Sequence, residues 1–333
     1  MIGLKRLAYV TNTDSNDISV VDLTENKEVG RIPIGGSPRG GMAIDQKGVY
    51  GYVSNCAGNT ISIIDLANNR EVTRVTVGLS PRGVALTPDS SLLFVSNSGS
   101  ADVSVIDTSK REEITRIPVG DNPRALSVTP DGKYINIPCW GADSISVVEI
   151  NYKNPVEMKE NYRLYLGKDA KPYHVFSHYD GKHAYSANTH RHTVSVIDLL
   201  DMKVKNEIPV GYGPRAVIAD PKEPFLYVSC EASNAVSVID TLQQKEVKQI
   251  PVGPTPRGLK IDEAKHVILC SAFSRHLSPD LMHDANSLSV IDLKKKEKID
   301  VIKVGLGPCS INIYDPVHYE NQINSNNKEY IKS

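Results

Sequence analysis

Histidine is the residue type whose clustering first suggests chemistry in this sequence. Five of the nine histidines fall within residues 171–192, which read KPYHVFSHYDGKHAYSANTHRH. Imidazole nitrogens bind zinc and other borderline metals, so the segment raises the hypothesis of a metal site. If the segment forms two antiparallel strands, His174 and His178 are separated by about 13 Å at ~3.3 Å per residue, which excludes one ion bound by all five. The candidate metal ligands that remain are His174, His190 and His192, with His283 from a later loop.

Arginine recurs after proline with a regularity that also suggests chemistry. Guanidinium groups bind carboxylates and phosphates through two parallel hydrogen bonds, so a ring of such residues would hold a small anion. The alternative is a structural role, in which the arginines pack between repeat units. Tyr173 stands at the equivalent position of the histidine-rich segment, and Cys309 stands there near the end of the chain. The recurring arginines are Arg39, Arg82, Arg124, Arg215 and Arg257.

These residues belong to a repeat of roughly forty residues. Each unit contains a YVTN-like strand, a VSVID-like strand, a segment such as EITRIPVG and a segment such as PRGVALTPD. Apolar residues alternate with small or polar ones, and Pro, Gly, Asn and Asp interrupt them every few residues, which predicts four short strands joined by turns. The VSVID-like copies lie at 17–22, 60–65, 102–107, 144–149, 193–198, 235–240 and 287–292.

Seven four-stranded sheets that cannot bury both faces alone are predicted to pack around an axis. YVTN, VSVID and IPVG are similar to the YVTN-type β-propeller repeat, and the resemblance covers residues 7 to about 315. We therefore expect an all-β, seven-bladed β-propeller of four-stranded antiparallel blades. The chain starts at the second strand of blade 1 and PCSINIYD (308–315) supplies its innermost strand, so the C-terminal strand should pair with the N-terminal blade and close the ring.

The same register predicts one propeller domain over 1–315 and a polar tail over 316–333. It also places the starts of the innermost strands and the ends of the second strands on one face, which we call the upper face. His178 and His183 are then expected in a turn on the opposite face. We expect a monomer.

Departures from the repeat also map to the upper face. Trp140, the single tryptophan, and Glu231 each follow a cysteine where other units have asparagine. Blade 7 carries a loop about ten residues longer than its counterpart in blade 6, with Arg275, His276 and His283. Long loops on a rigid scaffold commonly carry binding and catalysis. We take His174, Glu231 and His276 as catalytic candidates, and Trp140, Tyr173, Arg275 and the five arginines as ligand-binding candidates.

The sequence contains no motif or composition typical of several classes of protein. The sequence has no nucleophile elbow, zincin, P-loop or dinucleotide motif, and its formal charge of −1 gives no overall field toward nucleic acid. Five cysteines without CxxC spacing argue against a disulfide scaffold. No apolar run is long enough for a membrane span or a signal-peptide core, so we expect a cytoplasmic protein as the sequence stands, or an exported one if a signal peptide was removed.

The sequence is therefore consistent with two functions. The first is a binding or scaffold propeller whose upper face holds a small anionic molecule or a protein partner. The second is a hydrolase or lyase acting on a small anionic substrate, since blades 5 and 6, with His174, His178 and Glu231, resemble the propeller-type 6-phosphogluconolactonases. The sequence requires no cofactor, and the histidines leave room for a divalent metal that would assist catalysis. Whether the protein is an enzyme stays open at this stage.

Overall fold

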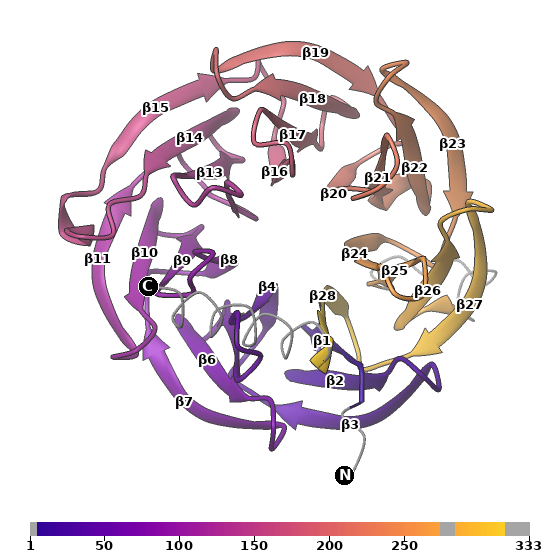
Figure 1. Cartoon of the computed structure of the whole chain (residues 1–333), viewed down its shortest axis with the longest axis horizontal. Helices are drawn as coiled ribbons and strands as arrows, with labels where there is room; N and C mark the ends of the chain where they lie inside the picture. Colours follow the sequence, from indigo (N-terminus) through magenta and orange to yellow (C-terminus); the bar gives the residue numbers. More distant parts are fainter. Residues whose placement is uncertain (1–4, 274–283, 317–333) are drawn as a thin grey trace, which may run out of the picture.

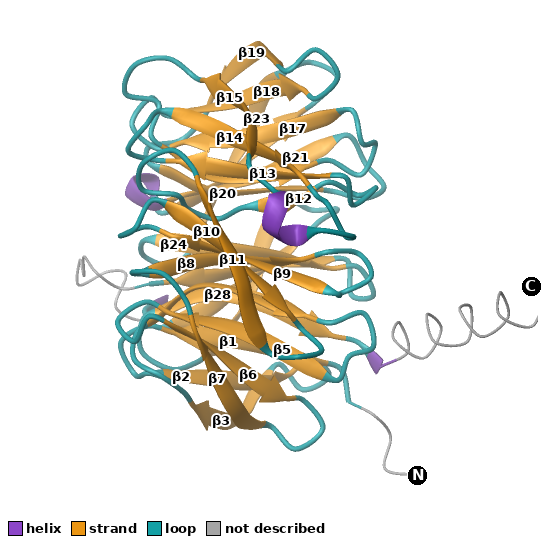
Figure 2. Cartoon of the chain, turned by 90° about the vertical axis from the view of Figure 1, so that its left-hand side faces the viewer, coloured by secondary structure: helices purple, strands orange, loops and turns teal. Residues whose placement is uncertain are grey.

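The computed structural model describes residues 5–273 and 284–316. Seven four-stranded antiparallel sheets surround a central axis, and each runs from an inner strand to an outer one (Figure 1). The expected all-β, seven-bladed propeller is thereby confirmed. Seen from the side, the strands lie between two faces on which the loops and turns gather (Figure 2).

The first four blades contain the following strands, given from the axis outward. Blade 1 has β28 (Pro308–Tyr314), β1 (Leu7–Asn12), β2 (Asp17–Asp22) and β3 (Lys27–Pro33). Blade 2 has β4 (Pro38–Ile44), β5 (Tyr50–Asn55), β6 (Thr60–Asp65) and β7 (Arg70–Thr76). Blade 3 has β8 (Pro81–Leu86), β9 (Leu92–Asn97), β10 (Asp102–Asp107) and β11 (Glu112–Pro118). Blade 4 has β12 (Ser127–Val128), β13 (Tyr134–Cys139), β14 (Ser144–Glu149) and β15 (Glu160–Tyr165).

The remaining blades follow the same order. Blade 5 has β16 (Pro172–Ser177), β17 (His183–Asn188), β18 (Thr193–Asp198) and β19 (Lys203–Pro209). Blade 6 has β20 (Pro214–Ala219), β21 (Phe225–Cys230), β22 (Ala235–Asp240) and β23 (Lys245–Pro251). Blade 7 has β24 (Pro256–Asp262), β25 (Val267–Ala272), β26 (Ser287–Asp292) and β27 (Glu297–Lys303). Two single-turn helices, η1 (Pro155–Glu157) and η2 (Glu231–Ser233), interrupt the loops.

The ring closes through blade 1, as the register predicted. β28 pairs antiparallel with β1, so that Leu7 faces Tyr314 and Val10 faces Ile311. Arg6 strengthens the closure because its guanidinium binds Asp315 at 2.6 Å and the buried Asp262 of blade 7 at 2.5 Å. The two ends of the propeller are thus held in one sheet and tied to the neighbouring blade.

The repeated polar residues build the scaffold. In blade 3 the Asn97 amide donates to Ser104 Oγ at 2.8 Å, and the Gly78 N–H donates to the same oxygen at 3.3 Å. A Cβ atom on Gly78 would lie 2.5 Å from Asn97 Nδ2, so a side chain at this position would clash with the asparagine. The asparagine of YVTN, the serine of VSVID and the glycine of IPVG recur because they meet in one buried cluster.

Apolar side chains from adjacent blades form the core between the sheets. One cluster joins Phe94 and Val105 of blade 3 to Ile135 and Val148 of blade 4, and equivalent clusters fill the other interfaces. The VSVID-like strands are buried on both faces, which explains why apolar residues flank a small serine in each. No helix of the described ranges is long and apolar enough to cross a membrane.

The collar at the channel mouth

The inner strands line an axial cavity of about 290 Å³. The seven residues that follow the first proline of each inner segment all border it, and we call this set the collar. Its members are Cys309, Arg39, Arg82, Arg124, Tyr173, Arg215 and Arg257, in order from blade 1 to blade 7.

The backbone explains why the arginines face the cavity. A Cβ atom on Gly40 would lie 1.3 Å from the carbonyl oxygen of Arg82, and one on Gly258 would lie 2.4 Å from that of Cys309. The glycine after a collar arginine therefore packs against the backbone of the next blade and leaves no room there for a side chain. The arginine itself borders the axial cavity.

Glu231 neutralises one side of the collar. It begins η2 and accepts hydrogen bonds from Arg215 Nε and, at 2.8 Å, from Arg257. Burial alone would raise the pKa of the Glu231 carboxyl, but Arg257 and Arg215 hold that pKa below its ordinary value. Glu231 is therefore a carboxylate that fixes two guanidinium groups.

The opposite side carries positive charge without such a partner. Neither Arg82 nor Arg124 forms an ion pair with a carboxylate of the described ranges, and their Nε atoms are buried without a hydrogen bond. Burial, followed by the positive charge of Arg82, lowers the pKa of Arg124 to about 10. The guanidinium carbon of Arg124 lies 5.4 Å from the ring centres of both Trp140 and Tyr173. This side of the mouth is electrostatically suited to an anion.

Tyr173 is surrounded by guanidinium groups. Its ring lies between Arg124 and Arg215, whose guanidinium carbon is 4.5 Å from the ring centre, and its hydroxyl accepts a hydrogen bond from Arg257 at 3.4 Å. Burial opposes ionisation of the phenol, yet Arg257, Arg215 and Arg124 together bring the pKa of Tyr173 below its ordinary value. The collar thus contains a phenol of lowered pKa where five other blades have arginine.

His174 is built into the blade interface next to Tyr173. Its Nδ1 accepts a hydrogen bond from the Val217 N–H of blade 6 at 3.2 Å, and burial lowers its pKa to about 4. A neutral imidazole that accepts through Nδ1 carries its proton on Nε2, so neither nitrogen offers a lone pair to a metal. The structure thus gives His174 a structural hydrogen bond.

The other histidines do not complete a metal site. His190 stacks edge-on against Trp140 with ring centres 5.5 Å apart, and His192 Nδ1 accepts the Gly213 N–H at 3.1 Å. Over residues 5–273 and 284–316, no group of three or more His, Cys, Asp or Glu side chains is placed to hold a metal ion. The set His174, His190 and His192 is therefore not brought together, and a metal site that includes His283 stays a prediction because His283 lies outside the described residues.

His178 and His183 flank the turn between β16 and β17, as expected. Their Nδ1 atoms lie 3.1 Å and 2.7 Å from Asp180 Oδ2, so the two rings share one carboxylate at the turn. The candidates Arg275, His276 and His283 fall within 274–283, outside the described residues, and their roles stay predictions. On the edge of that segment, Phe273 is buried with its ring centre 4.2 Å from the guanidinium carbon of Arg257.

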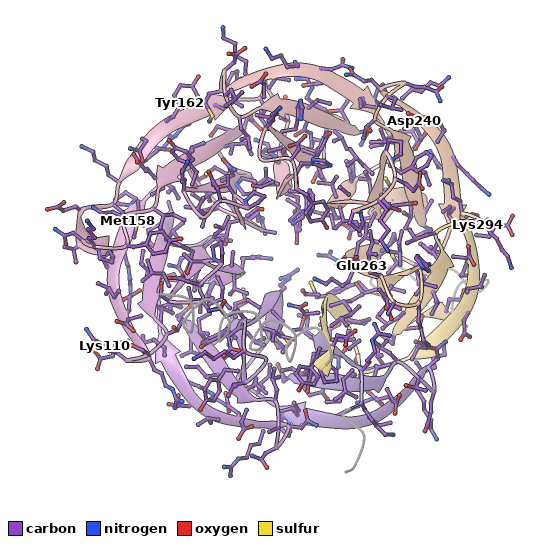
Figure 3. The ribbon with its side chains drawn as sticks, viewed as in Figure 1. Lys110, Met158, Tyr162, Asp240, Glu263 and Lys294 are labelled. Carbon is purple, nitrogen blue, oxygen red and sulfur yellow. The ribbon has the colours of Figure 1, made fainter. Side chains whose placement is uncertain are left out.

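The sequence reasoning missed a lysine that lines the cavity in addition to the five arginines. Lys260 borders the cavity below the collar, and burial lowers its pKa. Glu263 follows at the end of the same inner segment and lies nearer the axis than Lys110 or Lys294, which stand on the outer rim (Figure 3). The signal was present, because Lys260 interrupts the apolar residues of PRGLKIDE.

Seven closed four-stranded blades around a cavity with a charged collar define this chain as a seven-bladed β-propeller. Residues 115–267 match the family model of YNCE-like β-propellers, which supports the resemblance to propeller repeats. Residues 2–125 match the model of the cytochrome D1 heme domain. A search of curated proteins found no match.

Solved structures share the fold at low sequence identity. Hydrazine synthase of Kuenenia stuttgartiensis has 21% identity over 82% of this chain and 88% of that chain, with a TM-score of 0.71. The dihydro-heme d1 dehydrogenase NirN has 16% identity over 95% of this chain and 76% of that one, with a TM-score of 0.67. A putative 6-phosphogluconolactonase of Bacteroides fragilis has 15% identity over 95% and 99%, with a TM-score of 0.76. At these identities the likeness concerns the fold alone.

Proposed function

We propose that this propeller binds a small anionic molecule in the mouth of its axial cavity, on the side formed by Arg82 and Arg124. The observation that supports this most directly is the pairing pattern of the collar. Two of its arginines share Glu231, whereas Arg82 and Arg124 have no carboxylate among the described residues. A bound carboxylate or phosphate would supply the missing negative charge and accept the unused N–H groups.

The size and composition of the cavity agree with a small ligand. Its volume of about 290 Å³ lies at the lower end of ligand pockets, which span roughly 300–1,000 Å³. Tyr173 adds aromatic surface to the cavity beside Arg124, while Trp140 packs against the same guanidinium group, so a ligand with an acidic group would meet both a charge and an aromatic ring.

Calorimetry at low salt with inorganic phosphate, citrate and 6-phosphogluconate tests this proposal. Arg82→Ala and Arg124→Ala should each weaken binding of the preferred anion at least tenfold, roughly 1.4 kcal/mol, because each removes a direct charged contact. Arg116→Ala is the matched control, since Arg116 stands on the outer strand β11 and pairs with Glu113 at 2.8 Å. Unchanged affinity in both collar variants, or no binding of any probe to the wild-type protein, would refute the proposal.

Hydrolysis or elimination on such an anion is a second candidate, favoured by the acidic phenol of Tyr173 among the guanidinium groups. The lactonase named among the solved structures gives the first substrates to assay, gluconolactone and 6-phosphogluconolactone. If the site is catalytic, Tyr173→Phe should lower kcat, whereas Arg82→Ala should chiefly raise KM. Turnover equal to the uncatalysed rate in the wild-type protein would exclude these lactones as substrates.

A haem is a third kind of anion to consider, because the cytochrome D1 match includes Arg39, Arg82 and Arg124. Haem carboxylates would suit these arginines. The iron fits less well, since His174, the histidine that borders the cavity, accepts the Val217 N–H through Nδ1 and keeps its Nε2 proton. We therefore derive no step through haem, and a haem titration followed by absorbance would show whether the collar takes it up.

A further inference from the structure

Tyr173 is the only collar residue that can itself become an anion while three guanidinium groups face it. Arg124 approaches from blade 4, Arg215 from β20 and Arg257 from β24. Glu231 forms ion pairs with Arg215 and Arg257 and balances part of their positive charge. The negative charge of an ionised Cys309 in β28 acts in the opposite direction and raises the pKa of Tyr173. Adjacent His174 has its Nδ1 occupied by the Val217 N–H.

On losing its proton, Tyr173 would become an internal counter-ion for the collar, because three guanidinium groups face its ring or hydroxyl. The Arg124 guanidinium packs on the Tyr173 ring, and the positive charge of Arg82 lowers the pKa of Arg124. Arg124 therefore interacts both with Tyr173 and with the side of the collar that lacks a carboxylate. An external anion bound at Arg82 and Arg124 would satisfy the same positive charge. The Tyr173 phenolate and the external anion would therefore compete for the positive charge of the same guanidinium groups.

We propose that Tyr173 is the proton-accepting residue of the collar, and that its ligand is a small anion that binds together with a proton, such as a phosphate monoester or a hydroxy acid. The proton passes to the Tyr173 phenolate oxygen from an acid in the solvent. The electron pair of the broken bond stays on that solvent donor, which leaves as its conjugate base, so that anion binding takes up one proton from solution. No oxidant or reductant takes part. This inference rests on the anion site proposed above.

Titration of phenolate absorbance, without any ligand, tests whether Tyr173 ionises more easily than the other tyrosines. In the wild-type protein one tyrosine should titrate below the others, and this step should be absent in Tyr173→Phe. Arg124→Gln should move it upward by roughly 1 pH unit, because one of the three facing cations is gone. If all tyrosines titrate together in the wild-type protein, the inference is wrong even if the collar binds anions.

The number of protons taken up on anion binding tests whether Tyr173 is the residue that accepts them. With phosphate as the probe, calorimetry in buffers of different ionisation enthalpy should show proton uptake by the protein near the pKa of Tyr173 and a loss of that uptake in Tyr173→Phe. Saturating phosphate should also raise the low tyrosine pKa. Phosphate binding with identical proton uptake in both proteins would overturn the role of Tyr173 while leaving the anion site intact. Absence of anion binding would instead overturn the proposed function.

Discussion

The residue at each collar position decides how much positive charge remains at the channel mouth. Arginine places a cation at the axial cavity, Tyr173 replaces one of these cations by an ionisable phenol, and the single negative charge of Glu231 is shared by Arg215 and Arg257. His174 shows that an unusual residue beside this site can have a structural reason. It stands where other blades have a small residue, yet its ring fills the interface and accepts a backbone N–H.

We expect His174→Ala to lower the free energy of unfolding by about 1–3 kcal/mol, because the Val217 N–H would lose its acceptor inside the interface. His174→Asn should cost less, since its amide oxygen can accept the same hydrogen bond. Urea unfolding of both variants measures the difference. Equal stability of the two variants would show that the hydrogen bond does not contribute, and that only the volume of the ring matters.

The lowered pKa of His174 also makes a prediction about pH. Between its ordinary value of 6.5 and about 4, the unfolded state binds a proton that the folded state does not, so the histidine contribution to stability is lost as pH falls through this range. The loss amounts to about 3 kcal/mol at 1.36 kcal/mol per pH unit. The stability difference between wild type and His174→Asn, followed from pH 7 to pH 4, isolates this effect from the carboxylates. A difference that does not vary with pH would contradict it.

The blades differ in the residue that ends their second strand. Four blades have a buried asparagine there, whereas blades 4 and 6 have Cys139 and Cys230, each 3.3 Å from the serine oxygen that the asparagine contacts in the other blades. Both cysteines are buried, and burial raises the pKa of each thiol. These exceptions thus preserve the polar cluster of the repeat, and they need no catalytic explanation.

Restoring asparagine should be tolerated better in blade 4 than in blade 6. Ser144 Oγ is buried without a hydrogen bond, so the amide of Cys139→Asn would give it a donor, while the equivalent position in blade 6 is Ala235. We expect Cys139→Asn to be more stable than Cys230→Asn by about 1 kcal/mol, the usual value of one hydrogen bond. Thermal or urea unfolding compares the two. The reverse order would show that packing around the thiols outweighs the amide contacts.

We expect the molecule as a whole to be stable only as a closed ring. β28 supplies the inner strand of blade 1, packs Ile311 into the core shared with blade 7 and leads to Asp315, which binds Arg6. Without it, β1 would expose an unpaired edge and two blades would lose part of their shared interface.

Deleting residues 308–333 should therefore abolish cooperative unfolding, whereas deleting 317–333 should leave the transition unchanged. Residues 317–333 lie outside the described structure, and their role as a separate tail after the propeller domain remains a prediction. Circular dichroism melts of both deletions, with the full chain as reference, provide the measurement. A cooperative melt of the longer deletion would mean that blade 1 holds without its inner strand.

The sequence by itself determined the repeat, the four strands of each blade, the closure of the ring and the positions of the collar arginines. These features depend on alternation, turn residues and spacing, which are local and recur seven times. The same reasoning placed His178 and His183 in their turn, because strand length fixes the distance between two ends of a hairpin.

Only the tertiary structure decided how the site residues meet. Strand alternation predicts that Arg39 and Gly40 point to opposite sides, but only the packing of the next blade against Gly40 and the lining of the cavity by Arg39 show where each residue lies. Glu231 pairs with Arg257 across 26 residues, and Arg257 reaches Tyr173 across 84, so the charge left at the mouth follows from how separate blades approach one another. The described histidines of the metal hypothesis follow the same rule, since clustering in the sequence does not make His174, His190 and His192 converge when strands and turns hold them apart.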